Sequence, residues 1–453
     1  MSAFARVTRR SLLRGGAVML GSAAAAPLLS ACGGGGQGGN PKELTFWNFY
    51  GPNPQPDAQS KWFTDLAAQW NANNEVKVKL HYMPVTEYLA GRALQTAFSA
   101  GEGPDIFLLS PGDFLRYHNG GVLTDLTPYL GPDQIADFAD GALDTRKVDG
   151  KVYGLPMERE PLAVFYSVDA FEQAKLSEGD LPKTWDQLLD VAGKLTSKDR
   201  FGLLFETIPG YYQNFTWYPF MWMAGGSAVP ENGGPGFDSP AVHSALKLWQ
   251  DGITAKVCPR KPQGDGGTDT PANLGAGFAA MQQTGIWGVS QLAQNNAQNN
   301  KDFRYGVFPL PVPEGGTYTT SVGGWAFVAN AKGANPEAAA KFIAWALGAN
   351  DAEGVERGRR WNTVVKANLP ARTSVQEAAK SAGAFDDPAL KVFLDKVVPG
   401  SRGEPRYTPE VYKAVSDAIQ ATQLGGADPA KAAADAAAKI DTFLKGYKGA
   451  AML

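Results

Sequence analysis

Hydrophobic and polar positions in the first quarter of the chain follow two alternating patterns. Residues 43–50 predict a strand that runs into a loop, and the alternation at 76–80 predicts a second strand. Between them, apolar side chains recur at helical spacing in residues 61–71. A helix is predicted over 88–100, and 104–109 is a short apolar strand of the kind buried in parallel sheets. Strands that alternate with helices predict an α/β fold with a parallel sheet.

A second block of the same kind begins near residue 153. It contains predicted strands at 162–166, 201–205 and 303–308, and predicted helices at 184–195, 217–224, 241–252, 335–347 and from 428 onward. The sequence Thr-Trp-Asp-Gln at 184–187 is a capping box, which predicts a helix start. Residues 275–280 imitate a dinucleotide-binding glycine motif but have no clear leading strand, so we interpret them as a helix start rich in small residues.

Length and composition narrow the class of protein. A chain of 453 residues suggests two or three domains. A hydrophobic content of 44% excludes a disordered protein, and the near balance of 42 basic and 45 acidic residues, without a charged block, excludes a nucleic-acid groove. Two cysteines and three scattered histidines exclude a disulfide scaffold and give no metal-ligand spacing. No cofactor and no metal are expected.

The first 31 residues have the features of an export signal. Arg9 and Arg10 form a twin-arginine pair, an apolar run rich in Ala and Gly follows, and the segment ends in Leu-Ser-Ala before Cys32. This ending resembles the bacterial lipobox, in which the cysteine is lipidated. The alternatives are a transmembrane helix, for which the run is short and poor in large apolar residues, or a structural cysteine. We therefore predict a Tat-type lipoprotein signal at 1–31 and a lipidated Cys32 with a Gly-rich tether at 32–40.

Motifs of common enzyme classes are missing from the sequence. It contains no phosphate-binding loop, no Gly-x-Ser-x-Gly and no His-Glu-x-x-His. Glu158 and Glu160 could suggest a glycosidase pair, but they are two residues apart on an extended segment, and nothing marks them as flanking a bond. We expect a protein that is not an enzyme.

An ordered series of short motifs resembles a known family. The motifs are Leu44-Thr45-Phe46-Trp47, Gly103-Pro104-Asp105-Ile106-Phe107, Tyr153-Gly154-Leu155-Pro156, Pro182-Lys183-Thr184-Trp185, Met223-Ala224-Gly225-Gly226, Gly285-Ile286-Trp287, Pro309-Leu310-Pro311, Gly323-Gly324-Trp325 and Leu369-Pro370-Ala371-Arg372. Together they are similar to the family-1 extracellular solute-binding proteins of ABC transporters, the sugar-binding group that includes maltose-binding protein. The resemblance covers essentially residues 43–445.

This resemblance implies a two-lobed α/β fold of the periplasmic-binding-protein type, with a ligand cleft between lobes that are joined by hinge crossings. The crossings are expected near 158–162, 309–320 and 361–371. Lobe 1 would contain residues 41–158 plus 320–360, and lobe 2 would contain residues 159–319 plus 361–453. Ligands in open α/β sheets bind beyond the carboxyl ends of the strands, which agrees with a site between the lobes.

A sugar ligand needs aromatic faces for stacking and a few polar groups for its hydroxyls. By position or by resemblance, the candidate binding residues are Trp47, Asn48, Tyr50, Asp113, Glu160, Tyr212, Trp217, Trp287, Trp325, Trp361 and Arg372. In contrast, Trp62, Trp70, Trp222, Trp249 and Trp345 lie at helical spacing and are expected in the core, and Trp185 is expected to pack at a helix start.

Several candidates have a second interpretation that the sequence leaves open. Asp113 could be the N-cap of a helix beginning at Phe114. Glu160 could pair with Arg159 or Arg372 across the hinge, and Arg372 could hold the turn after residues 369–371. Indole rings such as Trp287, in an apparent Gly-containing loop, could pack in the core instead of facing the cleft.

The resemblance implies a lipid-anchored receptor on the extracellular face of the cytoplasmic membrane. It would capture a sugar or oligosaccharide by hinge closure and deliver it to the permease subunits of an ABC transporter, as a monomer that binds no nucleic acid. The number of aromatic candidates favours two or more sugar units. The alternatives are a lipid-anchored carbohydrate hydrolase, or the same fold binding a phosphorylated polyol or another non-sugar solute.

Overall fold

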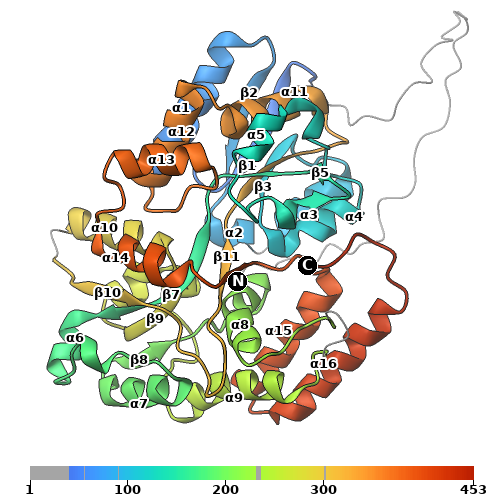
Figure 1. The fold of residues 1–453 in the computed structure, drawn as a ribbon. Helices are drawn as coiled ribbons and strands as arrows, with labels where there is room; N and C mark the ends of the chain where they lie inside the picture. The colour runs from blue at the N-terminus through green and yellow to red at the C-terminus, as the bar shows by residue number, and fades with distance from the viewer. Residues whose placement is uncertain (1–39, 56, 90, 231–235, 300–301) are drawn as a thin grey trace, which may run out of the picture. The chain divides into compact units, whose positions relative to one another are not determined.

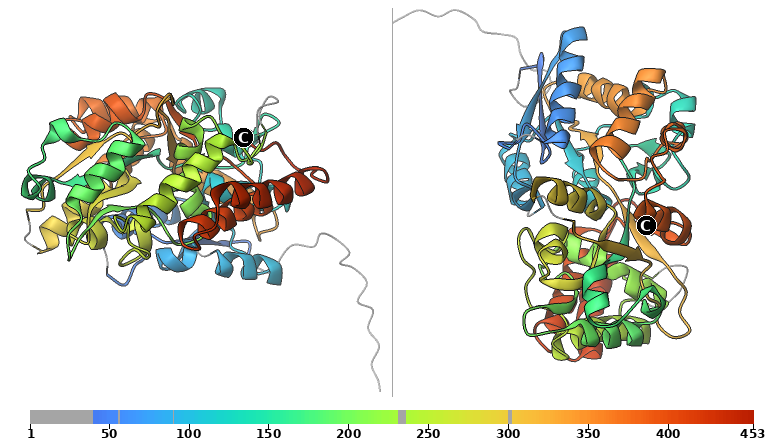
Figure 2. Two further views of the ribbon diagram at one scale, coloured as in Figure 1. Left: turned by 90° about the horizontal axis from the view of Figure 1, so that it is seen from below. Right: turned by 90° about the vertical axis from the view of Figure 1, so that its left-hand side faces the viewer.

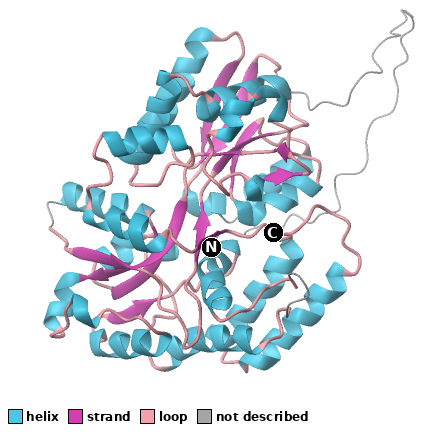
Figure 3. Cartoon of the chain, viewed as in Figure 1, coloured by secondary structure: helices cyan, strands magenta, loops and turns pink. Residues whose placement is uncertain are grey.

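The computed structural model describes residues 40–453 except 56, 90, 231–235 and 300–301. The predicted export signal, Cys32 and the tether up to residue 39 lie outside the described residues. The fold is two-lobed, and each lobe is built around a mixed β-sheet (Figures 1 and 3). In the described part of the chain, no helix is long and apolar enough to cross a membrane.

The first sheet begins with parallel strands and ends with antiparallel ones. Its order is β2 (Lys77–Tyr82), β1 (Glu43–Asn48), β3 (Ile106–Leu109), β12 (Ala326–Ala329) and β6 (Leu155–Pro156). β1 pairs in parallel with β2 and β3, whereas β12 is antiparallel to β3 and β6. The carboxyl ends of β1 and β3 therefore meet at one edge of this sheet.

The second sheet is centred on β7, all eight residues of which are buried. Its order is β13 (Ser401–Gly403), β11 (Thr320–Gly323), β7 (Glu160–Ser167), β9 (Ala279–Gly285) and β8 (Phe201–Leu204), with β10 (Tyr305–Phe308) also paired to β7. A separate two-stranded sheet is formed by β4 (Lys147–Val148) and β5 (Lys151–Val152).

Helices cover both sheets. Those associated with the first sheet are α1 (Ala58–Asn73), α2 (Val85–Leu89), α3 (Arg92–Ala100), α4 (Phe114–Asn119), α5 (Pro132–Ala136), α11 (Pro336–Ile343), α12 (Ala352–Arg360) and α13 (Thr373–Ser381). Those associated with the second are α6 (Val168–Gln173), α7 (Trp185–Leu195), α8 (Tyr211–Met223), α9 (Pro240–Thr254), α10 (Trp287–Asn299), α14 (Pro388–Val392), α15 (Pro409–Gln423) and α16 (Pro429–Leu444). Helices α15 and α16 pack side by side (Figure 2).

Single helical turns connect these elements. They are η1 (Pro111–Asp113), η2 (Thr127–Tyr129), η3 (Asp144–Arg146), η4 (Glu178–Asp180), η5 (Gly266–Thr268), η6 (Pro271–Gly275), η7 (Ala344–Gly348), η8 (Trp361–Val365) and η9 (Phe393–Val397).

The helix-spaced tryptophans form the cores as predicted, with one difference. Trp62, Trp70, Trp222 and Trp249 are buried, whereas Trp345 is half-buried. In the second lobe the rings of Phe205 and Trp249 stack at 4.8 Å, and in the first lobe Phe46 packs edge-on against Phe327 at 4.7 Å. The predicted helix start at Thr184 is confirmed, because the Thr184 hydroxyl accepts from the Gln187 backbone N–H. The capping box is incomplete, since the Gln187 side chain accepts from the Lys183 backbone N–H and not from that of Thr184.

The interpretation of residues 275–280 as a helix start is wrong. Residues 279–285 form β9, which is buried along its whole length between β7 and β8. A strand covered on both faces has no polar alternation, so its small and apolar residues do not distinguish it from a helix. The predicted helix over 88–100 is also interrupted, since Gly91 adopts a positive φ before α3 begins.

The hinge crossings differ from those expected by resemblance. β11 belongs to the second sheet and β12 to the first, so the chain crosses at residues 324–325 and not at 309–320. Trp361 and Ala371 pack in the first core, and α13 lies against α12, so the return to the second lobe comes after α13 and not at 361. The predicted crossing near 158–162 agrees with the passage from β6 to β7.

Candidate functional site

A first aromatic patch, Phe49, Tyr88 and Trp325, lies at the carboxyl end of β1. The Phe49 ring is 4.9 Å from Trp325 and 5.2 Å from Tyr88, both in edge-to-face arrangements. Tyr88 is buried and its hydroxyl donates to the Leu108 carbonyl at 2.8 Å, whereas Phe49 and Trp325 are half-buried. The patch therefore offers two partly exposed rings on a fixed support. Phe49 was not among the predicted residues.

A second aromatic patch, Tyr212, Phe215 and Trp287, lies in the other lobe. Tyr212 is 6.2 Å from Trp287 and 6.3 Å from Phe215, measured between ring centroids. Trp287 is the second residue after β9 and begins α10, and a Cβ added at Gly285 would lie 1.9 Å from the indole. Glycine at this position is what allows the indole to cover the end of the strand.

The Trp287 indole has an unmatched donor. Its Nε1 is buried and has no hydrogen-bond partner among the described residues, although the ring itself is half-buried. A buried N–H without an acceptor costs about 1–3 kcal/mol, so such groups in native proteins call for an explanation. A ligand oxygen is one acceptor that would satisfy it.

The two patches are connected through β11. A Cβ added at Gly323 would lie 3.0 Å from the Phe215 ring, so Phe215 packs directly on the strand. Trp325 follows two residues later, after the chain has crossed to the first lobe. Aromatic residues from both lobes thus flank a single crossing segment.

Asp113 lies in the turn after β3 and is held from both lobes. Its carboxylate forms a 2.7 Å ion pair with Arg116 and accepts from the Tyr412 hydroxyl at 3.4 Å, while Arg116 also donates to that hydroxyl. Burial raises the pKa of Asp113, and the Arg116 charge opposes this. Asp113 occupies the N-cap position of α4, as the second interpretation predicted, but its side chain makes no capping hydrogen bond.

Glu160 belongs to a buried hinge network with Glu158, Lys366, Asn368 and Tyr50. Its carboxylate accepts from Lys366 Nζ at 2.8 Å and from Asn368 Nδ2 at 2.9 Å, and Lys366 also approaches the Tyr50 hydroxyl at 3.3 Å. Burial alone would lower the pKa of Lys366, but the charges of Glu158 and Glu160 outweigh it and raise that pKa. The alternative in which Glu160 pairs with Arg159 or Arg372 is wrong, because its charged partner is Lys366 and Arg372 pairs with Asp137.

Glu158 connects the network to two crossings. It accepts from the Trp325 backbone N–H at 3.2 Å and from the Trp361 indole N–H. Burial raises the pKa of Glu158 to about 7, although Lys366 opposes the rise. Glu158 and Glu160 thus join the β6–β7 crossing to residues 325 and 361–368.

A second buried pair, Glu404 and Arg146, was missed by sequence reasoning. Arg146 donates to the Gly324 carbonyl, and Glu404 accepts from the Gly112 backbone N–H. Burial raises the pKa of Glu404 to about 8, with Arg146 opposing, and burial lowers the pKa of Arg146 to about 10. The two residues come from different lobes and lie beside the turn that carries Asp113.

Five of the predicted binding residues are buried in supporting structure. Asn48 accepts from the Tyr50 and Gly51 backbone N–H groups, which shapes the turn after β1. Trp217 and Trp361 are 0% and 1% exposed. Tyr50 packs face to face on Phe63.

The fifth of these residues, Arg372, holds a turn. It forms a 2.7 Å ion pair with Asp137 and donates to the Ala349 carbonyl at 2.8 Å. The alternative interpretation, in which this arginine fixes the turn after residues 369–371, is therefore the one that the contacts favour.

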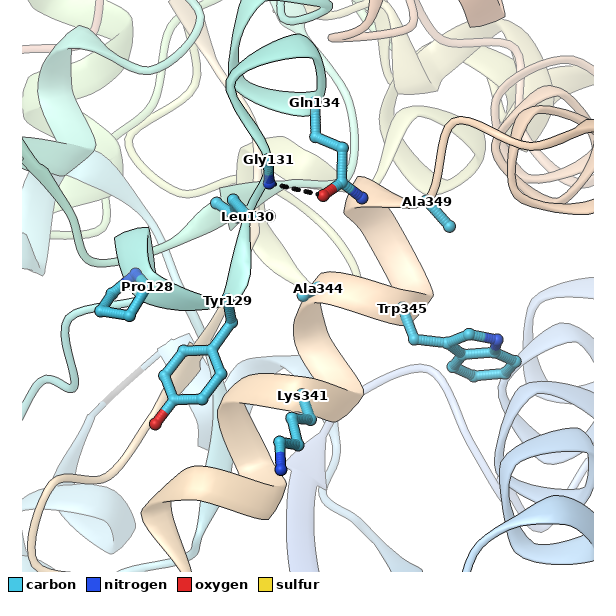
Figure 4. Close-up of a pocket in the computed structure, with 9 residues that line it drawn as sticks. All are labelled: Pro128, Tyr129, Leu130, Gly131, Gln134, Lys341, Ala344, Trp345 and Ala349. Atoms are coloured by element: carbon cyan, nitrogen blue, oxygen red, sulfur yellow. Dashed lines mark hydrogen bonds between the residues drawn. The ribbon is translucent and has the colours of Figure 1, made fainter.

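Two surface pockets of the first lobe are lined by residues outside the aromatic patches. Trp47 lines one of about 550 Å³, formed with α3. The other, of about 630 Å³, lies between η2–α5 and α11–η7 and is lined by Tyr129, Lys341 and Trp345 (Figure 4). Gln134 in this second pocket already uses both amide groups, on Gly131 N–H and on the Gly348 carbonyl. Volume alone therefore does not identify the site, and the aromatic and buried polar groups that gather at the crossings make the crossings the candidate site.

The two-lobed α/β fold is that of solute-binding proteins. The chain belongs to the bacterial extracellular solute-binding protein family, whose model matches residues 53–353. It is similar to the galactooligosaccharide-binding protein of Bacillus subtilis (strain 168), with 26% identity over 395 residues that cover 84% of this chain and 86% of the relative.

Solved structures share the fold. A solute-binding protein of an ABC transporter from Thermotoga lettingae TMO, bound with alpha-D-tagatose, has a TM-score of 0.75 and 22% identity, covering 89% of this chain and 100% of the other. UgpB from Mycobacterium tuberculosis, in complex with glycerophosphocholine, has a TM-score of 0.71 and 20% identity, covering 90% and 99%. At these identities the similarity concerns the fold and not the ligand.

Proposed function

We propose that this protein is an extracellular receptor that captures a sugar or oligosaccharide between its lobes and delivers it to the permease of an ABC transporter. The observation that carries the proposal is the pair of half-buried aromatic patches flanking one crossing, with the Trp287 N–H unmatched. Flat rings with nearby hydrogen-bonding groups suit the alternating apolar faces and hydroxyls of a sugar. The relatives named for oligosaccharides support the same ligand class.

The proposed ligand contacts are the partly exposed rings of both patches together with Asp113. Phe49 and Trp325 would stack from the first lobe, and Tyr212 and Trp287 from the second. The six predicted residues that are buried or lie elsewhere serve as support in this proposal: Trp47, Asn48, Tyr50, Trp217, Trp361 and Arg372. Glu160 stabilises the hinge through its bond to Lys366, and in this proposal it contacts a ligand only through carboxylate lone pairs that Lys366 and Asn368 do not use.

The charges near the site favour an uncharged ligand. Arg116, Lys366 and Arg146 each lie beside a buried carboxylate that opposes their charge. A phosphate ligand needs a cation that is available to it. The pairing of these cations therefore favours a neutral sugar over a phosphorylated ligand. Because one similar structure contains glycerophosphocholine, that compound is included in the binding test below.

Hinge closure provides the mechanism. Both patches contact the ligand only when the lobes approach each other, so the ligand shifts the equilibrium towards the closed form. Micromolar affinity corresponds to about −8 kcal/mol, which a few stacked rings and several hydrogen bonds can supply. The ligand is released unchanged, and the sugar recovered from the complex should show no cleavage by chromatography.

A thermal-shift panel followed by calorimetry tests the ligand class. Maltotriose, a galacto-oligosaccharide, tagatose and glycerophosphocholine are each titrated, and at least one neutral sugar should raise the melting temperature by linkage. Trp287→Ala should weaken binding of that sugar about tenfold, the factor for roughly 1.4 kcal/mol. Trp345→Ala, the matched change of a half-buried tryptophan in the pocket of Figure 4, should change affinity less than twofold. A response to glycerophosphocholine alone would contradict the proposal.

Membrane attachment is proposed separately, from the Leu-Ser-Ala-Cys sequence ending at Cys32. We expect export by the Tat route, lipidation of Cys32, and a monomer held at the outer face of the cytoplasmic membrane. Full-length protein should partition into the detergent phase of Triton X-114, and Cys32→Ser should move it to the aqueous phase. Cys258→Ser, which changes a buried cysteine, should leave the partitioning unaltered.

A further inference from the structure

The segment after α16, residues 445–453, extends from one lobe to the other. Helix α16 packs in the second core through Ala433 and Ile440. Beyond it, Ala450 packs against the first core, and Met452 contacts both cores. In Figure 1 this dark-red end of the chain leaves α16 and runs to the point marked C. We call residues 445–453 the C-terminal strap.

Polar contacts attach the C-terminal strap to Asn119, the last residue of α4. Asn119 Nδ2 donates to the Tyr447 hydroxyl at 3.0 Å, and the Ala450 backbone N–H donates to Asn119 Oδ1 at 3.2 Å. A Cβ added at Gly449 would lie 2.6 Å from Asn119 Nδ2, so the two segments are in close contact. Helix α4 begins directly after Asp113, and the strap therefore holds the far end of the element that carries this candidate ligand residue.

Arg406 joins the C-terminal strap to a second part of the first lobe. It lies before α15, is 3% exposed, and donates through Nε to the Ala451 carbonyl at 3.0 Å. Its Nη1 donates to the backbone carbonyls of Lys147, the first residue of β4, and of Asp144 in the preceding turn η3. A buried guanidinium donates its N–H groups to nearby acceptors. Here the acceptors are backbone carbonyls of the strap and of the first lobe.

We propose that the C-terminal strap, pinned by Arg406 and Asn119, is a non-covalent connection between the lobes that limits hinge opening. The three chain crossings are continuous backbone, so they can bend without breaking when the lobes rotate apart. The contacts of Asn119 and Arg406 join different lobes, so wide opening must break them. The inference rests on the hinge motion in the proposed function and not on the identity of the ligand.

Two variants of the full-length protein, each changing one polar side chain, test whether the C-terminal strap limits opening. Tyr447→Phe removes only the hydroxyl between Asn119 and Ala450, and Asn119→Ala removes both contacts to the strap. Asn73→Ala, the same change at an exposed helix end of the first lobe, is the control. Hydrogen exchange of peptides covering the strap and residues 144–148 is measured without ligand, together with the radius of gyration from small-angle X-ray scattering.

The expected result separates a strap from a merely ordered tail. Asn119→Ala, which removes two hydrogen bonds, should speed exchange in both the C-terminal strap and residues 144–148 by at least about fivefold, the factor for one hydrogen bond, and should raise the radius of gyration. Tyr447→Phe should act in the same direction, and Asn73→Ala should change neither quantity. Faster exchange confined to the strap with an unchanged radius of gyration, or no change at all, overturns the proposal. Because no sugar is added, this outcome is independent of the ligand test.

Discussion

Replacing Lys366 with methionine tests whether the hinge depends on one buried cation. Lys366 and Glu160 have side chains only 5% and 7% exposed, with 2.8 Å between Nζ and Oε1. Methionine is close in volume to the lysine stem, so the change removes the charge with little loss of packing. Glu158 and Glu160 would then remain buried with only neutral partners, Asn368, Trp361 and the backbone.

The expected decrease in the free energy of unfolding follows from this geometry. Breaking a buried ion pair from one side leaves an uncompensated charge and costs about 3–5 kcal/mol. Glu160→Gln should cost less, about 2 kcal/mol, because Lys366 still faces the charge of Glu158. The double variant Lys366→Met/Glu160→Gln should lose less than the sum of the two, with a coupling free energy of roughly 2 kcal/mol.

Urea unfolding at pH 7 measures these free energies, with an unchanged m value as the condition for comparing them. The matched control is Lys431→Met, which removes an exposed cation paired with Asp435 and should leave the free energy of unfolding almost unchanged. If Lys366→Met costs less than about 1 kcal/mol, or if the single changes simply add, then the hinge network does not act as a buried ion pair and the reasoning fails.

Three further outcomes are expected. Trp217→Ala should destabilise the fold by about 3–5 kcal/mol in urea, whereas Trp287→Ala should cost less than about 2 kcal/mol because its ring is half-buried; equal losses would contradict the division into core and site. Gly285→Ala should weaken sugar binding in calorimetry about as much as Trp287→Ala, since the new methyl group would displace the indole, and unaltered affinity would show that the indole is not a contact. Burial raises the pKa of Glu404 from 4.5 to about 8, so the folded state keeps a proton that the unfolded state releases, and stability should fall as pH rises through this range by at most about 1.4 kcal/mol per pH unit. Glu404→Gln should flatten that dependence, exposed Glu337→Gln should not, and identical pH curves for wild type and Glu404→Gln would refute the assignment.

The elements with a strong local pattern were predictable. The helix starts at Thr184 and Asn335 have a side-chain acceptor at the cap, and both are seen in the structure. Strand β9 was not predictable in this way, because a strand buried on both faces shows no alternation. Local chemistry thus located helix ends better than it located the central strands.

The sequence predicted which types of residue form the candidate site better than it predicted which individual residues do. Trp287 and Trp325 were expected near a cleft and are half-buried beside a crossing, but Trp217 and Trp361 looked equally suitable and lie in the cores. Nothing in the local sequence around Phe49 marks it as a better candidate than these. The exposed fraction of a ring depends on how neighbouring elements pack against it, and the sequence of a single segment does not determine this packing.

By itself the sequence determined the alternation of strands and helices, the family resemblance, and most of the tryptophans that form the cores. The elements and the individual motifs depend on residues within a few positions of one another, and the resemblance depends on the order of those motifs along the chain. Only the tertiary structure decided that Glu160 pairs with Lys366, which is 206 residues away, and that Glu404 faces Arg146. Such partners meet because the chain passes between its lobes several times, and burial at these crossings makes each charge depend on whichever residue the fold brings beside it.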